Sequence, residues 1–257
     1  MSLQLLQENR FELKYIIPER IAREVRQFAR SYLVPDPHAD PETVSYNIHS
    51  IYLDSNDLAL CRSTVQGHKN RFKLRVRYYN DDPASPVFFE IKRRVNDNIR
   101  KRRAAVKRPS VLPLLDGHWP HRSDLVDEND GKALEALGQF CDLRGRIWAQ
   151  PQVIVSYNRE AWVSPRDNSI RLTFDRELTA TEWTRRLVTD VFGKGLRVPV
   201  PGVILELKFT DRFPNWMRTM VQVFNLRRQS MAKYVQCMRV MRSPHLFVPR
   251  ISTEAVI

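Results

Sequence analysis

Basic side chains occupy every second position of the segment Arg71-Phe72-Lys73-Leu74-Arg75-Val76-Arg77. Because successive side chains of a β-strand point to opposite faces, one face of this strand is wholly basic and the other wholly apolar. Like charges a few Å apart repel by about 4 kcal/mol per pair at an effective dielectric near 20, which excludes such a face from a dry core. The basic face must therefore meet water, or an anion that neutralises it.

The same alternation recurs in four other segments, and carboxylates join the basic residues on the charged face. The pattern Glu-x-Lys occurs at 12–14, 90–92 and 206–208. A single strand of this kind is usually the solvated face of an open sheet. Five strands whose polar face is dominated by Lys and Arg favour one shared basic surface instead. The charged faces of these four segments carry Arg10, Glu12 and Lys14; Glu90 and Lys92; Arg171, Thr173 and Asp175; and Glu206 and Lys208.

Alternation with period two predicts eight strands, and helical periodicity predicts four longer helices between and after them. No internal segment has the composition of a linker, so we expect one domain over residues 1–257, with a core at about 8–241 and a C-terminal tail at 242–257. The pattern predicts an α+β fold, an antiparallel eight-stranded β-barrel with a charged lumen, covered by helices on its apolar outer face. The predicted strands are 9–17, 47–54, 71–79, 86–95, 99–106, 152–162, 169–177 and 202–210; the predicted helices are 18–32, 131–141, 214–225 and 230–241, and 107–130 is predicted to be a loop with a short helix.

The composition narrows the class of protein. Lys and Arg number 42 against 29 Asp and Glu, a net charge of +13 that indicates an anionic partner. Three cysteines without close spacing argue against a disulfide framework or a zinc site. No apolar run approaches the roughly 18 residues of a membrane-spanning helix, and the N-terminus does not resemble a signal peptide, so we expect a cytoplasmic protein. The glycine-rich phosphate-binding motifs GxxxxGK[ST] and GxGxxG do not occur.

Eight short motifs, taken in order, resemble those of the triphosphate tunnel metalloenzymes, which include the CYTH proteins and the polyphosphate polymerase (VTC) domain. The resemblance covers about residues 8–241. CYTH triphosphatases typically begin with Glu-x-Glu-x-Lys, whereas Arg10 stands at the first Glu position here, which resembles the polymerase branch more closely. The motifs are Arg10-Phe11-Glu12-Leu13-Lys14-Tyr15, Ser50-Ile51-Tyr52-Leu53-Asp54, Lys73-Leu74-Arg75-Val76-Arg77-Tyr78, Phe89-Glu90-Ile91-Lys92, Tyr157-Asn158-Arg159, Arg171-Leu172-Thr173-Phe174-Asp175, Leu205-Glu206-Leu207-Lys208-Phe209 and Ala232-Lys233-Tyr234.

The resemblance implies a metal-dependent polyphosphate polymerase, which transfers the γ-phosphate of ATP to a growing polyphosphate chain inside the basic tunnel. Glu206 would hold a divalent cation, Mn²⁺ or Mg²⁺, and Glu12 would either assist it or pair with Lys14. Glu90 and Asp175 are expected to be ion-pair partners that orient the basic groups. Lys14, Arg75, Arg77, Lys92, Arg159, Arg171 and Lys233 would contact the triphosphate or the polyphosphate, Arg10, Lys73 and Lys208 would be further phosphate contacts, and one of Lys101, Arg102 and Arg103 would reach the tunnel.

Two other functions stay open at this point. An inorganic or nucleoside triphosphatase would use the same tunnel with water as the acceptor. A non-catalytic module that binds polyphosphate or nucleic acid would need the basic charge alone. Because the aromatic residues alternate opposite the basic ones, we expect them in the core and not stacked on bases, so nucleic acid is not the expected partner. Eukaryotic complexes of the resembling family couple the polymerase to membrane helices, and a translocation role for this chain would need another protein.

Overall fold

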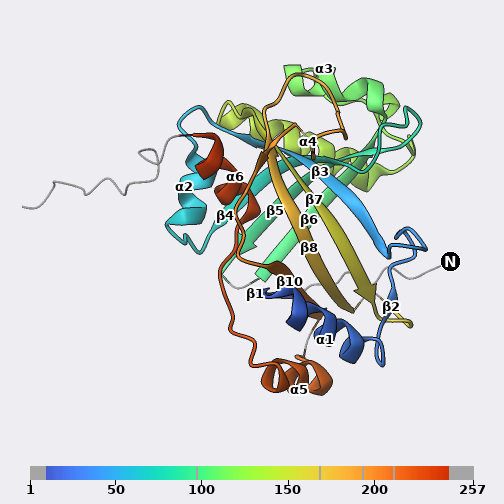
Figure 1. Cartoon of the computed structure of the whole chain (residues 1–257). Helices are drawn as coiled ribbons and strands as arrows, with labels where there is room; N and C mark the ends of the chain where they lie inside the picture. The colour runs from blue at the N-terminus through green and yellow to red at the C-terminus, as the bar shows by residue number, and fades with distance from the viewer. Residues whose placement is uncertain (1–9, 97, 168, 193, 211, 243–257) are drawn as a thin grey trace, which may run out of the picture.

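A single strongly curved antiparallel sheet dominates the computed structural model, which describes residues 10–96, 98–167, 169–192, 194–210 and 212–242 (Figure 1). Its main strands follow one another in the order β1-β10-β8-β7-β3-β4-β5-β6, and two short strands pair at the sides, β2 with β7 and β9 with β8. All eight predicted strands are present, with ends that differ by a few residues. The strands are β1 (Arg10–Ile17), β2 (Val34–Pro35), β3 (Ser45–Asp54), β4 (Arg71–Tyr78), β5 (Val87–Val95), β6 (Asn98–Val106), β7 (Gln150–Val163), β8 (Ile170–Thr181), β9 (Leu196–Arg197) and β10 (Val203–Thr210).

The four longer predicted helices are also present, and one short helix was not predicted. That helix is α2, whose seven residues include two β-branched ones and make a weak helical pattern. The carboxylate of Asp54, at the end of β3, stabilises the first turn of α2. It accepts the backbone N–H groups of Leu60 and Cys61 at 2.9 and 2.8 Å. No helix of the described residues is long and apolar enough to cross a membrane. The helices are α1 (Glu19–Ala29), α2 (Ala59–Val65), α3 (Val111–Asp116), α4 (Gly131–Arg146), α5 (Asn215–Val223) and α6 (Lys233–Met241).

The apolar face of the sheet is buried beneath helices, as the alternation predicted. Helices α1 and α5 cover one part of this convex face, where Phe174 and Leu205 are fully buried. Helices α3 and α4 cover another part, and the rings of Phe89 and Phe140 meet edge to face there with centroids 5.0 Å apart. Helix α6 is the exception, because it packs on the concave face against Val155 and its neighbours. The helices therefore stabilise the outside of the sheet and also close one end of its inside.

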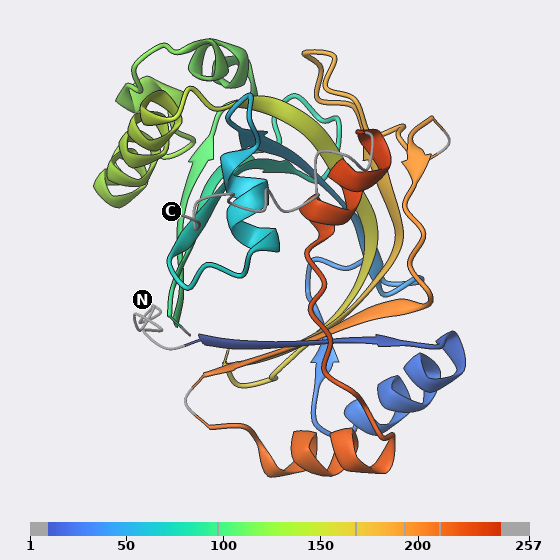
Figure 2. The same ribbon diagram turned by 90° about the vertical axis from the view of Figure 1, so that its left-hand side faces the viewer.

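The sheet curls round as the predicted barrel requires, but hydrogen bonds between the described strands do not close it. Strands β1 and β6 lie near each other, and Lys92 of β5 reaches Glu12 of β1 across the gap at 2.8 Å. Strands β1 and β6 end the strand order, and within the described residues they do not pair with each other. The free edge of β1 instead meets the segment 226–232 that leads into α6, which we call the strap (Figure 2). Tyr15 of β1 forms a bridge with Arg228 of the strap, and the backbone N–H of Gln229 donates to the Lys14 carbonyl over 2.8 Å. The strap thus occupies hydrogen-bonding positions that a closing strand would need.

Candidate functional site

The charged concave face encloses a narrow cavity of about 90 Å³. Six strands and the start of α6 contribute to its wall, which brings together ten of the twelve site residues that the sequence predicted. Eight lining side chains are cations and two are carboxylates. The cavity is lined by Glu12, Lys14, Tyr52, Lys73, Arg75, Arg77, Lys92, Tyr157, Arg159, Glu206, Lys208, Ala232 and Lys233.

Glu206 lies at the centre of the cationic residues of the cavity. One carboxylate oxygen lies 3.1 Å from the Lys14 ammonium and 2.8 Å from that of Lys233. The other lies 2.8 Å from Lys208 Nζ and 3.5 Å from a guanidinium nitrogen of Arg159. Burial opposes the negative charge, but the four cations outweigh it and hold the pKa of Glu206 well below its usual value. Glu206 is therefore ionised at neutral pH and is available to a cation that displaces its partners.

Two further carboxylates lie behind the cavity wall and orient its cations. Asp175 is 1% exposed and takes a two-pronged ion pair from Arg159, with N–O distances of 2.6 and 2.7 Å. Its second oxygen also lies 2.6 Å from Lys233 Nζ. Glu90 is 0% exposed, and one of its oxygens accepts from Arg75 Nε over 2.6 Å. The prediction that both carboxylates form ion pairs is confirmed, and each fixes the direction of a guanidinium group.

Of the four consecutive basic residues 100–103 on β6, Lys101 and Arg103 share the face that carries Glu90, and Lys101 is the one that pairs with this carboxylate. Its ammonium lies 2.5 Å from the free oxygen of Glu90. Arg102 projects from the other face and pairs with the exposed Glu135. The guanidinium of Arg103 stacks on Phe88, with its central carbon 3.5 Å from the ring centroid. Lys101 therefore continues the row of cations that crosses β4 and β5, because Lys73, Lys92 and Lys101 are register partners.

Two of the predicted site residues are not part of the cavity wall as described. Arg171 shares a strand with Asp175, but its guanidinium pairs with Asp36 and donates to the Tyr46 hydroxyl over 2.7 Å, away from the lining residues. The ion pair with Asp36, which follows β2, turns the Arg171 guanidinium in this direction. Strand alternation alone could not predict this contact. Arg10 begins β1 in register with Thr210, and its side chain lies outside the described residues, as do residues 243–257 of the predicted tail.

Two tyrosines of the cavity wall were not assigned a role from the sequence. Tyr157 lies two residues before Arg159, so period-two alternation, applied to uncharged residues, would have placed it on the concave face. Tyr52 lies there because β3 pairs with β4 in the register that sets it opposite Arg75. The Tyr52 hydroxyl lies 3.3 Å from a guanidinium nitrogen of Arg75. Burial raises the pKa of Tyr52, but the nearby cations of β4 outweigh burial and lower it to about 8.

Two lysines of the cavity wall, Lys208 and Lys73, respond to burial differently from Lys14. Burial lowers the pKa of Lys208 to about 7, although Glu206 opposes the shift. Burial likewise lowers the pKa of Lys73 to about 8. In contrast, Glu206 and Glu12 together outweigh burial at Lys14 and raise its pKa. The cavity therefore contains basic groups that gain protons readily when an anion enters.

The donor set fits a divalent cation that is held jointly by the protein and by phosphate. Within the described residues no three His, Cys, Asp or Glu side chains gather into a cluster that could hold a metal ion. Two carboxylates line the cavity, however, and Lys14 bridges them, 3.0 Å from Glu12 and 3.1 Å from Glu206. Mg²⁺ is commonly bound through one or two carboxylates together with substrate phosphates and water, which is the coordination that this pair can supply.

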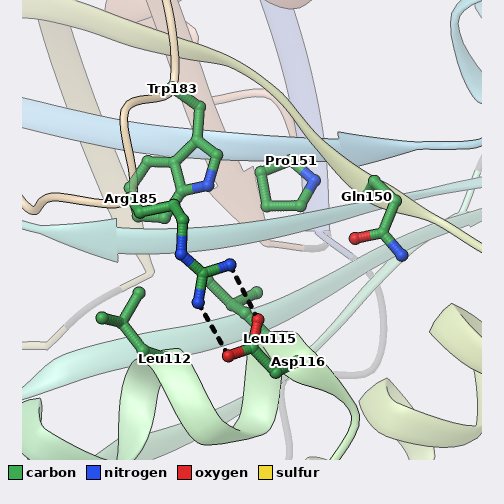
Figure 3. Close-up of a pocket in the computed structure, with 7 residues that line it drawn as sticks. All are labelled: Leu112, Leu115, Asp116, Gln150, Pro151, Trp183 and Arg185. Atoms are coloured by element: carbon green, nitrogen blue, oxygen red, sulfur yellow. Dashed lines mark hydrogen bonds and ion pairs between the residues drawn. The ribbon is translucent and has the colours of Figure 1, made fainter.

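A second cavity, of about 190 Å³, shares no residue with the charged one. It lies between α3, the start of β7 and residues 183–185 (Figure 3). Arg185 spans it and forms a two-pronged ion pair with Asp116, with N–O distances of 2.9 and 2.8 Å. Trp183 and Leu112 provide apolar walls. None of the predicted site residues lines this cavity, and the charge of Arg185 is already compensated by Asp116.

Comparisons with known proteins agree with this geometry. A model of the VTC domain family matches residues 9–242. No curated protein sequence matches the chain. Among solved structures, a candidate adenylate cyclase from Bacillus halodurans aligns with a TM-score of 0.51 and 13% identity over 89% of this chain and 96% of its own. A candidate adenylyl cyclase from Hippeastrum, described with a dominant triphosphatase activity, aligns with a TM-score of 0.46 and 9% identity over 88% of this chain and 93% of its own. The Bacillus halodurans protein therefore shares the fold of this chain. Because the family model spans nearly the whole chain, the protein belongs to the VTC domain family.

Proposed function

We propose that the chain is a phosphotransferase that moves the γ-phosphate of ATP onto a growing polyphosphate chain within the cavity. The observation that carries the proposal is the charge of the cavity wall, where eight cations face two carboxylates. A net positive charge enclosed in a narrow space repels itself strongly unless an anion enters. A chain of phosphates is thin and carries negative charge along its whole length, so it matches the cavity better than a duplex or a membrane surface does.

The arginine and lysine side chains of the cavity wall would bind such a chain in different ways. The guanidinium groups of Arg75, Arg77 and Arg159 can each grip two phosphate oxygens, while the lysines act as point charges. An entering phosphate competes with Glu206 and Glu12 for their ammonium partners and so releases carboxylate oxygens. A divalent cation bound there would neutralise charge on the phosphate oxygens. The acceptor in this reaction is an ionised phosphate, so a strong general base is not required.

Incubation of the purified protein with ATP and Mn²⁺ tests the proposal directly. We expect a ladder of long polyphosphate on a polyacrylamide gel. Free phosphate without a ladder would indicate a triphosphatase instead, and binding of polyphosphate without any turnover would indicate a binding module. Arg159→Met should abolish the ladder. Arg176→Met is the matched control, because Arg176 is also paired to carboxylates, Glu19 and Glu160, but lies outside the cavity wall.

The lowered pKa values of Lys73 and Lys208 predict how phosphate binding depends on pH. Their pKa values of about 8 and about 7 mean that both are protonated near pH 6 and largely neutral near pH 9. Only the ammonium form attracts phosphate, so binding must take up protons as the pH rises through this window. We expect the affinity for inorganic tripolyphosphate to fall roughly tenfold between pH 6.5 and 8.5, measured by titration calorimetry.

The double variant Lys73→Arg/Lys208→Arg separates this effect from the ionisation of the ligand itself. Arginine stays charged throughout this range, so the variant should lose most of the pH dependence and bind more tightly than the wild type at pH 8.5. Parallel pH profiles for the two proteins would show that neither lysine titrates in the cavity.

A further inference from the structure

Asp54, the last residue of β3, is a buried carboxylate that the proposed mechanism does not use. It is 0% exposed, and its hydrogen-bond partners are neutral donors. One oxygen accepts the backbone N–H groups of Ser55 and Leu60, each over 2.9 Å. The other accepts the backbone N–H of Cys61 and the hydroxyl of Tyr234, each over 2.8 Å. A carboxylate is costly to bury, and it offers two acceptor oxygens where an amide offers one. The backbone donors use both oxygens, and the Tyr234 hydroxyl is the partner that comes from a distant element.

Tyr234 directly follows Lys233 in the first turn of α6. Its ring stacks on Tyr52, with centroids 4.7 Å apart and an angle of 7° between the planes. Tyr52 in turn lines the cavity and lies within hydrogen-bond distance of Arg75. The hydrogen bond from Tyr234 to Asp54 therefore connects the end of β3 to two cations on different walls of the cavity.

Helix α6 is held against the sheet by apolar packing of Val235, Cys237 and Met238, but its first turn lacks a side-chain cap. Ala232 stands at the N-cap position and has no side-chain oxygen to accept the free N–H groups of the helix. The strap before it meets β1 through Arg228 and Gln229. Lys233 itself is held at its ammonium end by Asp175 and Glu206, both of which an entering phosphate must compete with. When those ion pairs exchange, the backbone of Lys233 needs an anchor that does not exchange.

We propose that Asp54 is a positioning residue, which through the hydroxyl of Tyr234 holds the first turn of α6 so that the Lys233 ammonium stays aimed at phosphate in the cavity. The inference rests on the proposed function only in that phosphate is the ligand of the cavity. It does not depend on whether the acceptor is polyphosphate or water.

A thermodynamic cycle with inorganic tripolyphosphate as the probe tests this role in the full chain without metal. Tyr234→Phe removes the hydroxyl and leaves the ring stack and the backbone contacts of Asp54 in place. We expect it to weaken binding about tenfold, in line with the loss of a hydrogen bond to a charged group. In a Lys233→Ala background the same change should alter the affinity by less than about twofold, because the group that it positions is gone. Asp54→Asn changes the acceptor of this hydrogen bond instead of its donor, and its effect on binding should show the same dependence on Lys233.

Tyr78→Phe is the matched control, since its hydroxyl is also buried and donates to a backbone carbonyl, that of Val188, over 2.7 Å. It should leave binding unchanged, and thermal melting should show that every variant is folded. Equal losses with and without Lys233, unchanged binding in Tyr234→Phe, or an equal loss in Tyr78→Phe would each overturn the proposal. Wild-type protein that does not bind tripolyphosphate would overturn both this inference and the proposed function. Binding without polyphosphate synthesis would overturn the proposed polymerase alone.

Discussion

Replacing Glu206 by glutamine is expected to lower metal-dependent turnover of ATP at least 100-fold while metal-free binding of tripolyphosphate stays the same or tightens. The two effects have opposite signs because the carboxylate has two roles in the proposed mechanism. It pairs with four cations in the free protein, so removal of its negative charge leaves the cavity more positive. It is also one of the two cavity carboxylates that can hold a divalent cation, and loss of that charge removes about 3 kcal/mol of transition-state stabilisation. Turnover with Mn²⁺ and calorimetry without metal measure the two effects separately.

Glu160→Gln serves as the control for this experiment. Glu160 is also a buried carboxylate and pairs with Arg26 at 2.6 Å and with Arg176 at 3.1 Å, but it does not line the cavity. Glu160→Gln should lower the free energy of unfolding. It should change neither the turnover of ATP with Mn²⁺ nor the metal-free affinity for tripolyphosphate. If Glu206→Gln weakened binding and turnover by the same factor, Glu206 would act only by holding its cationic neighbours in place.

Strand alternation predicted the part of this protein that regular backbone geometry controls. Once Arg71–Arg77 is recognised as a strand, the side chains of Lys73, Arg75 and Arg77 must share a face, and the same rule gathers the residues of β1 and β10. That is why most of the cavity wall follows from the order of the amino acids alone. The rule could equally have found Tyr157 from Arg159, had it been applied to residues without charge, whereas Tyr52 needs the register of β3 with β4.

The elements that alternation missed depend on contacts between distant parts of the chain. Arg171 is on the expected strand, yet Asp36, far away in sequence, draws its guanidinium aside. The strap pairs with the edge of β1 through Tyr15 and Arg228, and a pattern of polar and apolar residues carries no information about which edge a loop will cover. Helix α2 forms where the Asp54 carboxylate caps its N–H groups. In each case a single tertiary contact determines the local structure, and secondary-structure propensity is too weak to predict it.

Replacing Arg75 by methionine is expected to weaken tripolyphosphate binding about 100-fold and to lower the free energy of unfolding by about 3–5 kcal/mol. Methionine roughly keeps the length of the side chain but removes the two guanidinium nitrogens that lie 2.6 Å from Glu90. Glu90 is fully buried; Lys101 still pairs with its other oxygen at 2.5 Å, but Arg77 lies 3.9 Å away, too far to replace the lost contact. Denaturant unfolding measures the loss of stability, and calorimetry measures the loss of binding.

A second substitution separates these two losses. Adding Glu90→Gln removes the poorly compensated buried charge, so stability should return to within about 1 kcal/mol of the wild type. Tripolyphosphate binding should remain at least tenfold weaker, because neither methionine nor glutamine replaces a charged two-pronged donor. Arg26→Met is the matched control: Arg26 grips Glu160 at 2.6 and 2.8 Å outside the cavity, so it should cost stability and leave binding intact. Recovery of binding together with stability in the double variant would mean that Arg75 supports the fold and does not contact phosphate.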